Sequence, residues 1–209
     1  DSSTSRGLGD VYKRQTYDYL KTVIGNKPTH YVTTNQDGLF KKYFGEDAVS
    51  EIQGSWFFFQ SSNTKTDKHL YSAEPIVKEL LPKIKDHKLD REDFPKSPVD
   101  DSPLIAWVRG PEFLEDERYN YEYQKVNHFL AQHRGEKILF LEMGVGRMTP
   151  MFIQEPFWEM TQYMRDAFYI NINPKDAITN PVIRERSLLI GDDINEVLKE
   201  ASEEIKEGR

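Results

Sequence analysis

Two short polar segments near the start of the chain carry the side chains best suited to chemistry. The first, residues 33–39, reads Thr-Thr-Asn-Gln-Asp-Gly-Leu and follows a short apolar stretch, and the second, residues 51–55, reads Glu-Ile-Gln-Gly-Ser. A strand that ends in amides, a carboxylate and a glycine delivers hydrogen-bonding groups to the rim of a sheet, where open α/β folds bind ligands. Asn35 and Asp37 are therefore suited to orienting a ligand through hydrogen bonds.

Gln53, in the second segment, is an amide rather than a titratable group. Glutamine has no side-chain group with a pKa near neutrality, so it cannot serve as a general base. It can still hydrogen-bond a hydroxyl or an incoming nucleophile. The two segments together predict a polar site that binds a ligand through hydrogen bonds.

A second group of polar strand ends lies in the later half of the chain. Gly144, Val145 and Gly146 stand between a predicted strand at residues 137–143 and a predicted helix at 156–164. Glycines at this place let backbone amides approach a phosphate or a ribose, and the N-terminus of the following helix favours negative charge. Two further polar segments follow strands: Asn171, Ile172 and Asn173, and then Gly191, Asp192 and Asp193. Each alone is typical of a turn or a helix cap, but as a series they predict one ligand-binding rim.

From residue 16 onward, predicted helices and strands alternate. Helices are predicted at residues 16–25, 39–44, 75–85, 119–134, 156–164 and 193–203, and strands at 30–34, 49–52, 56–60, 104–108, 137–143, 167–172 and 187–190. Strands that alternate with helices indicate βα units and a parallel sheet. We expect a Rossmann-like α/β domain made of residues 16–60 and 106–209, with a small inserted module at residues 61–105.

Composition narrows the class of protein. The chain has 209 residues and a net charge of -7 without a basic cluster, which argues against nucleic acid or an anionic membrane as a partner. No apolar run approaches the roughly 20 residues of a membrane span, and no signal-peptide pattern opens the chain. We therefore expect a cytoplasmic protein. With no cysteine, the chain has no disulfide, no thiol nucleophile and no thiolate zinc site, and its five histidines suggest no metal site.

The ordered motifs resemble those of the sirtuins, a family of NAD-dependent enzymes. Residues 33–39 resemble the family's Thr-Gln-Asn-Ile-Asp-Xaa-Leu-His motif, and residues 51–55 resemble its His-Gly motif, with Gln53 at the place of the catalytic histidine. The glycine segment is similar to the motif that contacts NAD, and the two later segments are similar to those beside the adenosine ribose and the adenine. The resemblance implies that NAD is the substrate and that its site contains Thr34, Asn35, Gln36, Asp37, Gln53, Gly144, Val145, Gly146, Asn171, Ile172, Asn173, Asp192 and Asp193.

Gln53 and the sequence Trp-Val-Arg-Gly around Arg109 resemble one bacterial branch, the macrodomain-linked sirtuins. That branch transfers ADP-ribose to a lipoyl-carrier protein. The resemblance implies an ADP-ribosyltransferase that releases nicotinamide, with Asn35, Asp37, Gln53 and Arg109 as catalytic residues. It also implies two partners, a protein acceptor, for which a lipoyl-carrier protein is the candidate, and a macrodomain protein.

Several alternatives remain open at this level. Arg109 could bind a carboxylate or phosphate through two N–H groups, or it could form a structural ion pair with Glu112 or Glu115. A protein deacylase would need a base other than Gln53, and a catalytically degenerate module that binds NAD or ADP-ribose is a third function.

Two expectations concern segments in which the chain departs from the family. Residues 10–15 read Asp-Val-Tyr-Lys-Arg-Gln, which matches a translation of transposase mosaic-end DNA, so we expect residues 1–15 to be a disordered sequencing scar. The family's N-terminal glycine-rich motif is then expected to be missing, and NAD binding by the remaining residues to be weak. The module at residues 61–105 has none of the four zinc-binding cysteines of the family, so zinc is not expected there.

Overall fold

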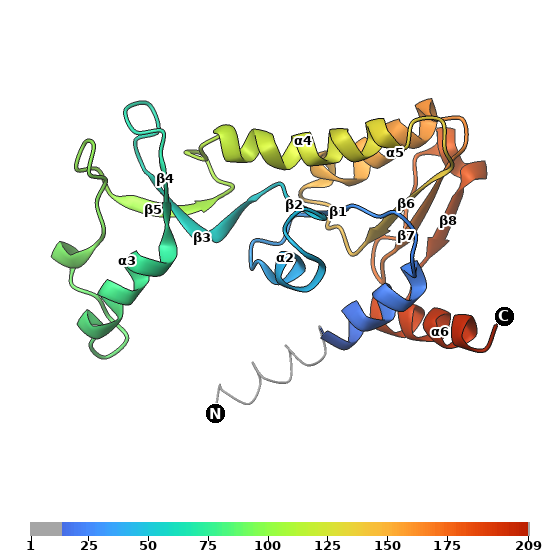
Figure 1. Ribbon diagram of the computed structural model, residues 1–209, viewed down its shortest axis with the longest axis horizontal. Coiled ribbons are helices and arrows are strands. Elements are labelled where there is room, and N and C mark those ends of the chain that lie inside the picture. Colours follow the sequence, from blue (N-terminus) through green and yellow to red (C-terminus); the bar gives the residue numbers. More distant parts are fainter. Residues whose placement is uncertain (1–13, 209) are drawn as a thin grey trace. The chain divides into compact units, whose positions relative to one another are not determined.

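The structure is a computed structural model that describes residues 14–208, and these fall into two compact units (Figure 1). One unit comprises the described residues up to Thr29 together with those from His133 onward, and the other comprises His30–Gln132. The predicted scar at residues 1–15 lies outside the described residues, except for Arg14 and Gln15. These two belong to a helix that covers residues 14–24.

The unit that contains the C-terminal half is built on a parallel sheet. Its strands are β6 (Ile138–Met143), β7 (Ala167–Ile172) and β8 (Ser187–Ile190), in the order β6-β7-β8. Met143 pairs with Ile172, and Ile172 pairs with Ile190, so the carboxyl ends of all three strands are level. This alignment places the loops after the strands at one edge of the sheet.

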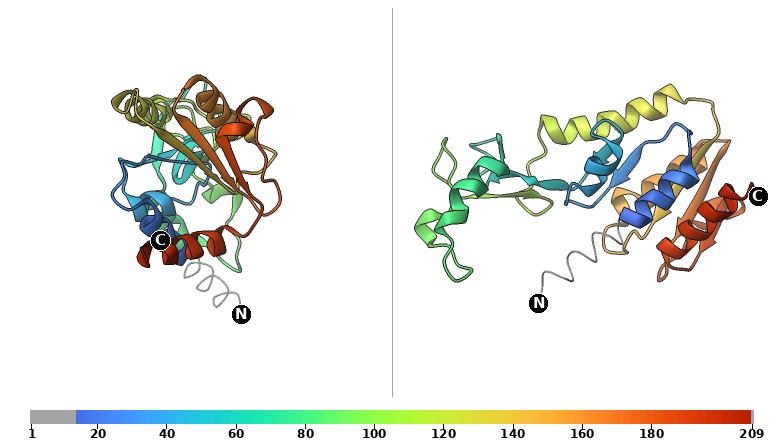
Figure 2. Two further views of the ribbon diagram at one scale, coloured as in Figure 1. Left: turned by 90° about the vertical axis from the view of Figure 1, so that its right-hand side faces the viewer. Right: turned by 60° about the horizontal axis from the view of Figure 1, so that its bottom comes forward.

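Helices cover both faces of this sheet. Figures 1 and 2 show α5 (Gln154–Tyr163) on one face, and α6 (Ile194–Lys206) with the helix at residues 14–24 on the other. Two 3-10 helices, η3 (Pro150–Phe152) and η4 (Pro181–Arg186), lie in the connections. The Thr16 hydroxyl donates to Asn195 Oδ1 (2.8 Å), which ties the first helix to the start of α6. Strands with helices on both faces are the layered α/β arrangement that the sequence predicts.

The second unit contains a small parallel pair and an antiparallel sheet. β1 (Tyr31–Thr33) pairs in parallel with β2 (Val49–Glu51), and α2 (Leu39–Phe44) lies in the connection between them. The antiparallel sheet has the order β4-β3-β5, from β4 (Leu70–Ser72), β3 (Gly54–Ser61) and β5 (Leu104–Val108). The remaining helices are α3 (Ala73–Leu80), α4 (Glu117–Gln132), and the 3-10 helices η1 (Leu81–Lys83) and η2 (Arg91–Asp93).

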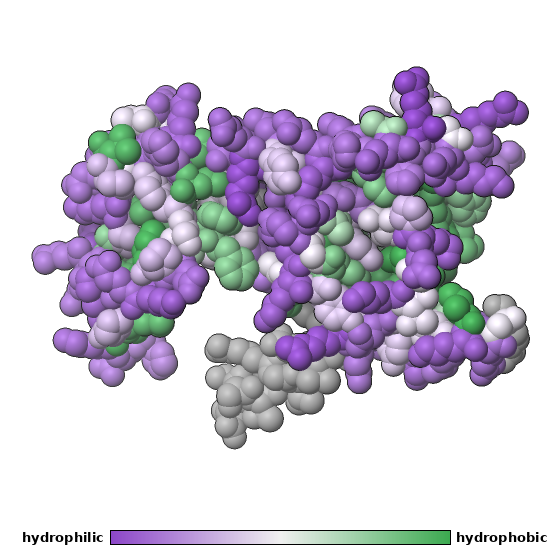
Figure 3. All heavy atoms as spheres, viewed as in Figure 1, coloured by the Kyte–Doolittle hydropathy of each residue, from purple (hydrophilic) through white to green (hydrophobic). Residues whose placement is uncertain are grey.

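The predicted fold class is confirmed, with two local corrections. β4 is a strand that the sequence analysis does not predict, and the helix expected at residues 75–85 instead begins at Ala73 and ends at Leu80. Pro82 explains the early end, because it has no N–H to continue the α-helical hydrogen bonds and the chain passes into η1. Hydrophilic residues cover most of the face drawn in Figure 3. Trp56 and Phe57 on β3 are nevertheless exposed, at 60% and 58%.

Candidate functional site

The polar segment after β1 is hydrogen-bonded to the segment after β2 through its backbone. The Ile52 N–H donates to the Thr33 carbonyl (3.1 Å), and the Trp56 N–H donates to the Gln36 carbonyl (3.1 Å). The two donor residues, Ile52 and Trp56, lie on either side of Gln53 in the sequence. The structure therefore brings the two polar segments predicted to share a site into direct contact.

Asn35 and Asp37 lie in a turn that side chains stabilise. The Asn35 N–H donates to Thr33 Oγ1 (3.0 Å), and Asp37 Oδ1 accepts from the Leu39 N–H (3.1 Å) at the start of α2. Asn35 is exposed and its neighbours on both sides are partly buried, so its side chain is accessible to a ligand while its backbone is held. This is the arrangement expected of a residue that orients a reacting group.

Gln53 is 5% exposed and is held through its backbone. Its carbonyl oxygen accepts from Gln36 Nε2 (3.1 Å) and from the Arg109 N–H (2.9 Å). Its own side-chain Nε2 is buried and has no hydrogen-bond partner in the described part of the chain. An unpaired buried donor costs about 1–3 kcal/mol, and a ligand oxygen would remove that cost. A ribose hydroxyl is one group with a suitable acceptor.

Gly54 explains why Gln53 and Arg109 are neighbours. A Cβ atom on Gly54 would lie 2.1 Å from the Trp107 carbonyl oxygen, and the residue has a φ of +82°. Only glycine allows β3 to approach β5 so closely in this conformation. Gly54 pairs with Val108, and Arg109 follows directly.

The Arg109 guanidinium makes contacts of its own within this unit. Its Nη1 lies 2.7 Å from Glu115 Oε1, and its Nη2 donates to the Tyr119 hydroxyl (3.0 Å). The guanidinium carbon also lies 4.2 Å from the centre of the Phe113 ring and 5.1 Å from that of Tyr119. The structure thus shows the ion pair with Glu115, one of the two pairings considered for Arg109. A ligand carboxylate or phosphate would have to share or replace this contact.

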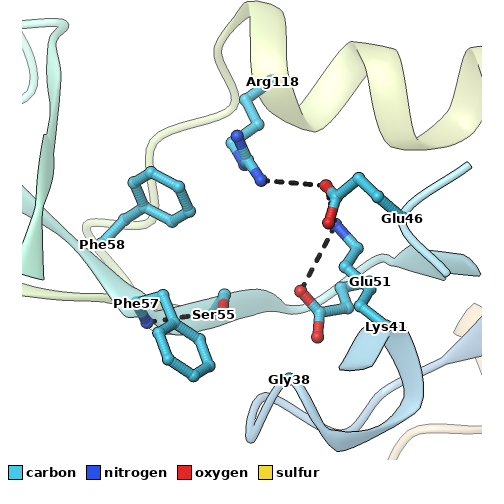
Figure 4. A pocket seen from close by; sticks show the side chains of 8 residues that line it. All are labelled: Gly38, Lys41, Glu46, Glu51, Ser55, Phe57, Phe58 and Arg118. Atoms are coloured by element: carbon cyan, nitrogen blue, oxygen red, sulfur yellow. Dashed lines mark hydrogen bonds and ion pairs between the residues drawn. The ribbon is translucent and has the colours of Figure 1, made fainter. Parts of the chain in front are cut away.

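A cavity of about 270 Å³ lies beside these segments (Figure 4). Its Glu51 side chain is 4% exposed and has one oxygen, Oε1, with no partner among the residues described, while Oε2 lies 3.5 Å from Lys41 Nζ. Burial raises the pKa of Glu51 above its usual value. The cavity is not lined by the predicted catalytic residues. Its lining comprises Gly38, Lys41, Glu46, Glu51, Ser55, Phe57, Phe58 and Arg118.

The other unit gathers the second group of predicted residues at the carboxyl ends of its strands. The Gly144 N–H donates to the Ile172 carbonyl (3.0 Å), and the Asn173 N–H donates to the Ile190 carbonyl (3.0 Å). Asn173 Nδ2 also donates to the Val145 carbonyl (3.1 Å). The glycine segment and the segment around Asn173 therefore form one cluster at the level edge of the sheet.

Several of these side chains also stabilise their own loops. Asp193 accepts from the N–H groups of Asn195 (2.9 Å) and Glu196 (3.2 Å) and thereby caps α6. Asn171 is fully buried, and its Oδ1 has no partner within residues 14–208. The glycine segment lies between β6 and α5, as predicted, and η3 lies between the glycines and the start of α5 at Gln154.

Buried carboxylates among residues 14–208, two of them Glu142 and Asp67, escaped sequence analysis. Glu142, on β6 just before the glycine segment, is 1% exposed and accepts from the Tyr169 hydroxyl and from Gln154 Nε2 (2.8 Å). Burial raises the pKa of Glu142. The signal that could have revealed it is a single acidic residue inside an otherwise apolar strand.

The second is Asp67, in the segment predicted as a small module. It is fully buried and accepts from the Ser97 hydroxyl (2.6 Å), the Tyr71 hydroxyl (2.9 Å) and the backbone N–H of His69 (2.9 Å). Burial alone would raise the pKa of Asp67, but the hydrogen bonds from Ser97 and His69 lower it to about 2. Among residues 14–208, no group of three His, Cys, Asp or Glu side chains could hold a metal ion.

No family model matches the chain. A curated protein named protein ADP-ribosyltransferase, from Staphylococcus aureus (strain Mu50), is 30% identical over 190 residues, which is 90% of this chain. The chain spans 60% of the length of that relative.

Solved structures of sirtuins are similar in fold. A mutant Sir2 homologue in complex with ADP-ribose matches 94% of this chain and 67% of its own, with a TM-score of 0.53 and 15% identity. A second sirtuin, from work on substrate affinity, matches 93% of this chain and 71% of its own, with a TM-score of 0.56 and 14% identity. The chain therefore shares the fold of these sirtuin structures, as its motifs predict. No helix in the described part of the chain is long and apolar enough to cross a membrane.

Proposed function

We propose that this chain is the NAD-binding part of a sirtuin-type protein ADP-ribosyltransferase. The observation that carries the proposal is Gln53, a buried amide with an unpartnered Nε2 at the place of the catalytic histidine of the family. The name of the relative that is 30% identical, protein ADP-ribosyltransferase, supports the same reaction. NAD is the proposed substrate, and the ADP-ribose-bound sirtuin of similar fold supports that choice.

In the proposed reaction, the bond between nicotinamide and the ribose carbon breaks, and nicotinamide leaves with the bonding electrons. The nucleophile of the acceptor forms a bond to the same carbon and transfers its proton to a base other than Gln53. Asn35 and Asp37 orient the ribose and support the charge that develops on it. The Gln53 Nε2 donates to an oxygen of the ribose or of the acceptor, which fills its empty hydrogen-bonding position.

Deacylation is the alternative, and it requires a base that Gln53 lacks. Loss of a positioned base typically costs about 10²–10⁴ in rate. Glu51 is a buried carboxylate close in the sequence, but it lines the cavity of Figure 4, which Gln53 does not line. Transfer of ADP-ribose is therefore favoured over deacylation.

The resemblance to the macrodomain-linked branch supports finer proposals. We propose a lipoyl-carrier protein as the acceptor, a macrodomain protein as a second partner, and a cytoplasmic location. The Trp-Val-Arg-Gly segment that ends at Gly110 supports them, together with Gln53.

The test uses the full-length protein and NAD labelled in its ADP-ribose part. We expect nicotinamide release and label on a lipoyl-carrier protein, and only slow deacetylation of an acetyl-lysine peptide. Asn35→Ala should abolish both release and transfer, whereas the control Asn26→Ala, at another exposed asparagine, should leave both unchanged. Rapid deacetylation without label on protein would instead make the deacylase the correct assignment. Nicotinamide release without either product would favour an NAD hydrolase.

A further inference from the structure

Two residues that depart from the sirtuin motifs are in contact with each other. Gln36 stands where the motif has isoleucine, and Gln53 stands where it has histidine. In the structure, Gln36 Nε2 donates to the main-chain carbonyl of Gln53 at 3.1 Å. An isoleucine side chain has no hydrogen-bond donor and could not make this contact.

The contact completes the hydrogen bonding of one peptide oxygen. A carbonyl oxygen has two lone pairs, and the Arg109 N–H donates to the same oxygen at 2.9 Å. The Gln36 side chain and the backbone N–H of Arg109 together fix the orientation of the peptide between Gln53 and Gly54. The Gln53 carbonyl thus joins two of the predicted catalytic residues, Gln53 and Arg109, to Gln36 in one hydrogen-bonded unit.

The position of Gly54 makes this restraint consequential. Glycine is the most permissive residue in backbone conformation, so the peptide between Gln53 and Gly54 gains little rigidity from local sterics. The Gln53 side chain is 5% exposed, and its Nε2 lacks a partner in the portion of the chain described. A small rotation of the backbone would move that amide group away from an acceptor on a bound ligand.

We propose that Gln36 is a positioning residue, which holds the Gln53 amide in place for the reacting nucleotide through the Gln53 carbonyl. The role in turnover rests on the proposed function. The hydrogen bond itself and its effect on Gln53 do not.

The experiment compares Gln36→Leu, which keeps the size but removes the donor, with Gln36→Glu, which keeps the length but offers only acceptors at neutral pH. Gln124→Leu, at an exposed glutamine on α4, is the matched control. Nuclear magnetic resonance of the full-length protein follows the carbonyl carbon of Gln53 and the exchange of the Arg109 amide proton. Both Gln36 variants should shift the carbonyl resonance and speed the exchange, and the control should do neither. Unchanged signals in Gln36→Leu would overturn the proposal.

Kinetics provide the second readout. Loss of one positioning hydrogen bond should lower kcat for nicotinamide release about tenfold, while the KM for NAD changes by less than about twofold. A raised KM with normal kcat would show that Gln36 binds NAD directly and would refute the positioning role. If the unaltered protein releases no nicotinamide, the proposed function fails, and the resonance measurements alone decide whether Gln36 positions Gln53.

Discussion

Replacing Gly54 by alanine should be among the most damaging single-methyl additions in this protein. The new Cβ would lie 2.1 Å from the Trp107 carbonyl oxygen and 2.8 Å from a ring carbon of Phe113. The first of these atoms belongs to the backbone of β5 and cannot move aside as a side chain can. We therefore expect Gly54→Ala to push β3 and β5 apart at the point where Gln53 bonds to Arg109.

The size of the effect follows from two separate costs. A non-glycine residue at a φ of +82° carries backbone strain of about 1–3 kcal/mol. Forcing a methyl group into a filled space adds about 1–3 kcal/mol. The free energy of unfolding should therefore fall by about 2–6 kcal/mol.

Gly45→Ala is the control that separates these costs. Gly45 has a φ of +98°, but a Cβ there would meet nothing within 4 Å. The free energy of unfolding of this variant is therefore lowered by backbone strain alone. Urea titration followed by tryptophan fluorescence would compare the two variants with the unaltered protein. We expect Gly54→Ala to be less stable than Gly45→Ala by about 2 kcal/mol. Equal losses in the two variants would refute the close approach of β3 to β5.

Three further outcomes are expected. Asp67→Asn should lower the free energy of unfolding by about 2 kcal/mol at pH 7 in urea titration, because it breaks a buried charged network. Since the folded pKa of Asp67 lies at about 2, below its unfolded value, its stabilisation is complete above about pH 4 and is lost as the pH falls toward 2. The variant should lack that loss, and equal acid sensitivity in both proteins would contradict this. Gln53→His should raise deacetylation of an acetyl-lysine peptide and lower ADP-ribose transfer, because it supplies a base, and no gain in peptide assays would count against the base argument. Arg109→Lys should reduce transfer more than NAD affinity, because lysine cannot reproduce the paired contacts to Glu115 and Tyr119, and a loss confined to NAD binding by calorimetry would exclude an acceptor role.

Elements with clear boundaries in the sequence were predicted closely. α2 lies between Gly38 and Gly45, and β5 follows Pro103, so residues that interrupt regular structure mark their ends. β7 and β8 also have the predicted bounds. β4, a strand of three residues, was not predicted.

The contacts that organise the candidate site could not be predicted in the same way. Gln36 and Gln53 are 17 positions apart, and Asp67 and Ser97 are 30 positions apart. No local pattern links such pairs, because each forms only when segments distant in the sequence come together. The sequence did identify Gln53 as the unusual residue, but not the donor that holds its carbonyl.

β3 links two features that have been considered separately. It begins at Gly54, next to Gln53, and ends at Ser61, whose hydroxyl lies 2.6 Å from that of Ser102 in the segment beyond Ser97. One strand thus has the amide side chain of Gln53, a candidate site residue, next to its first residue. Its last residue, Ser61, is hydrogen-bonded to Ser102. Under the proposed function, a compound that binds only residues 61–105 would therefore contact the same strand as a nucleotide analogue bound at Gln53. An inhibitor of the proposed reaction need not resemble NAD.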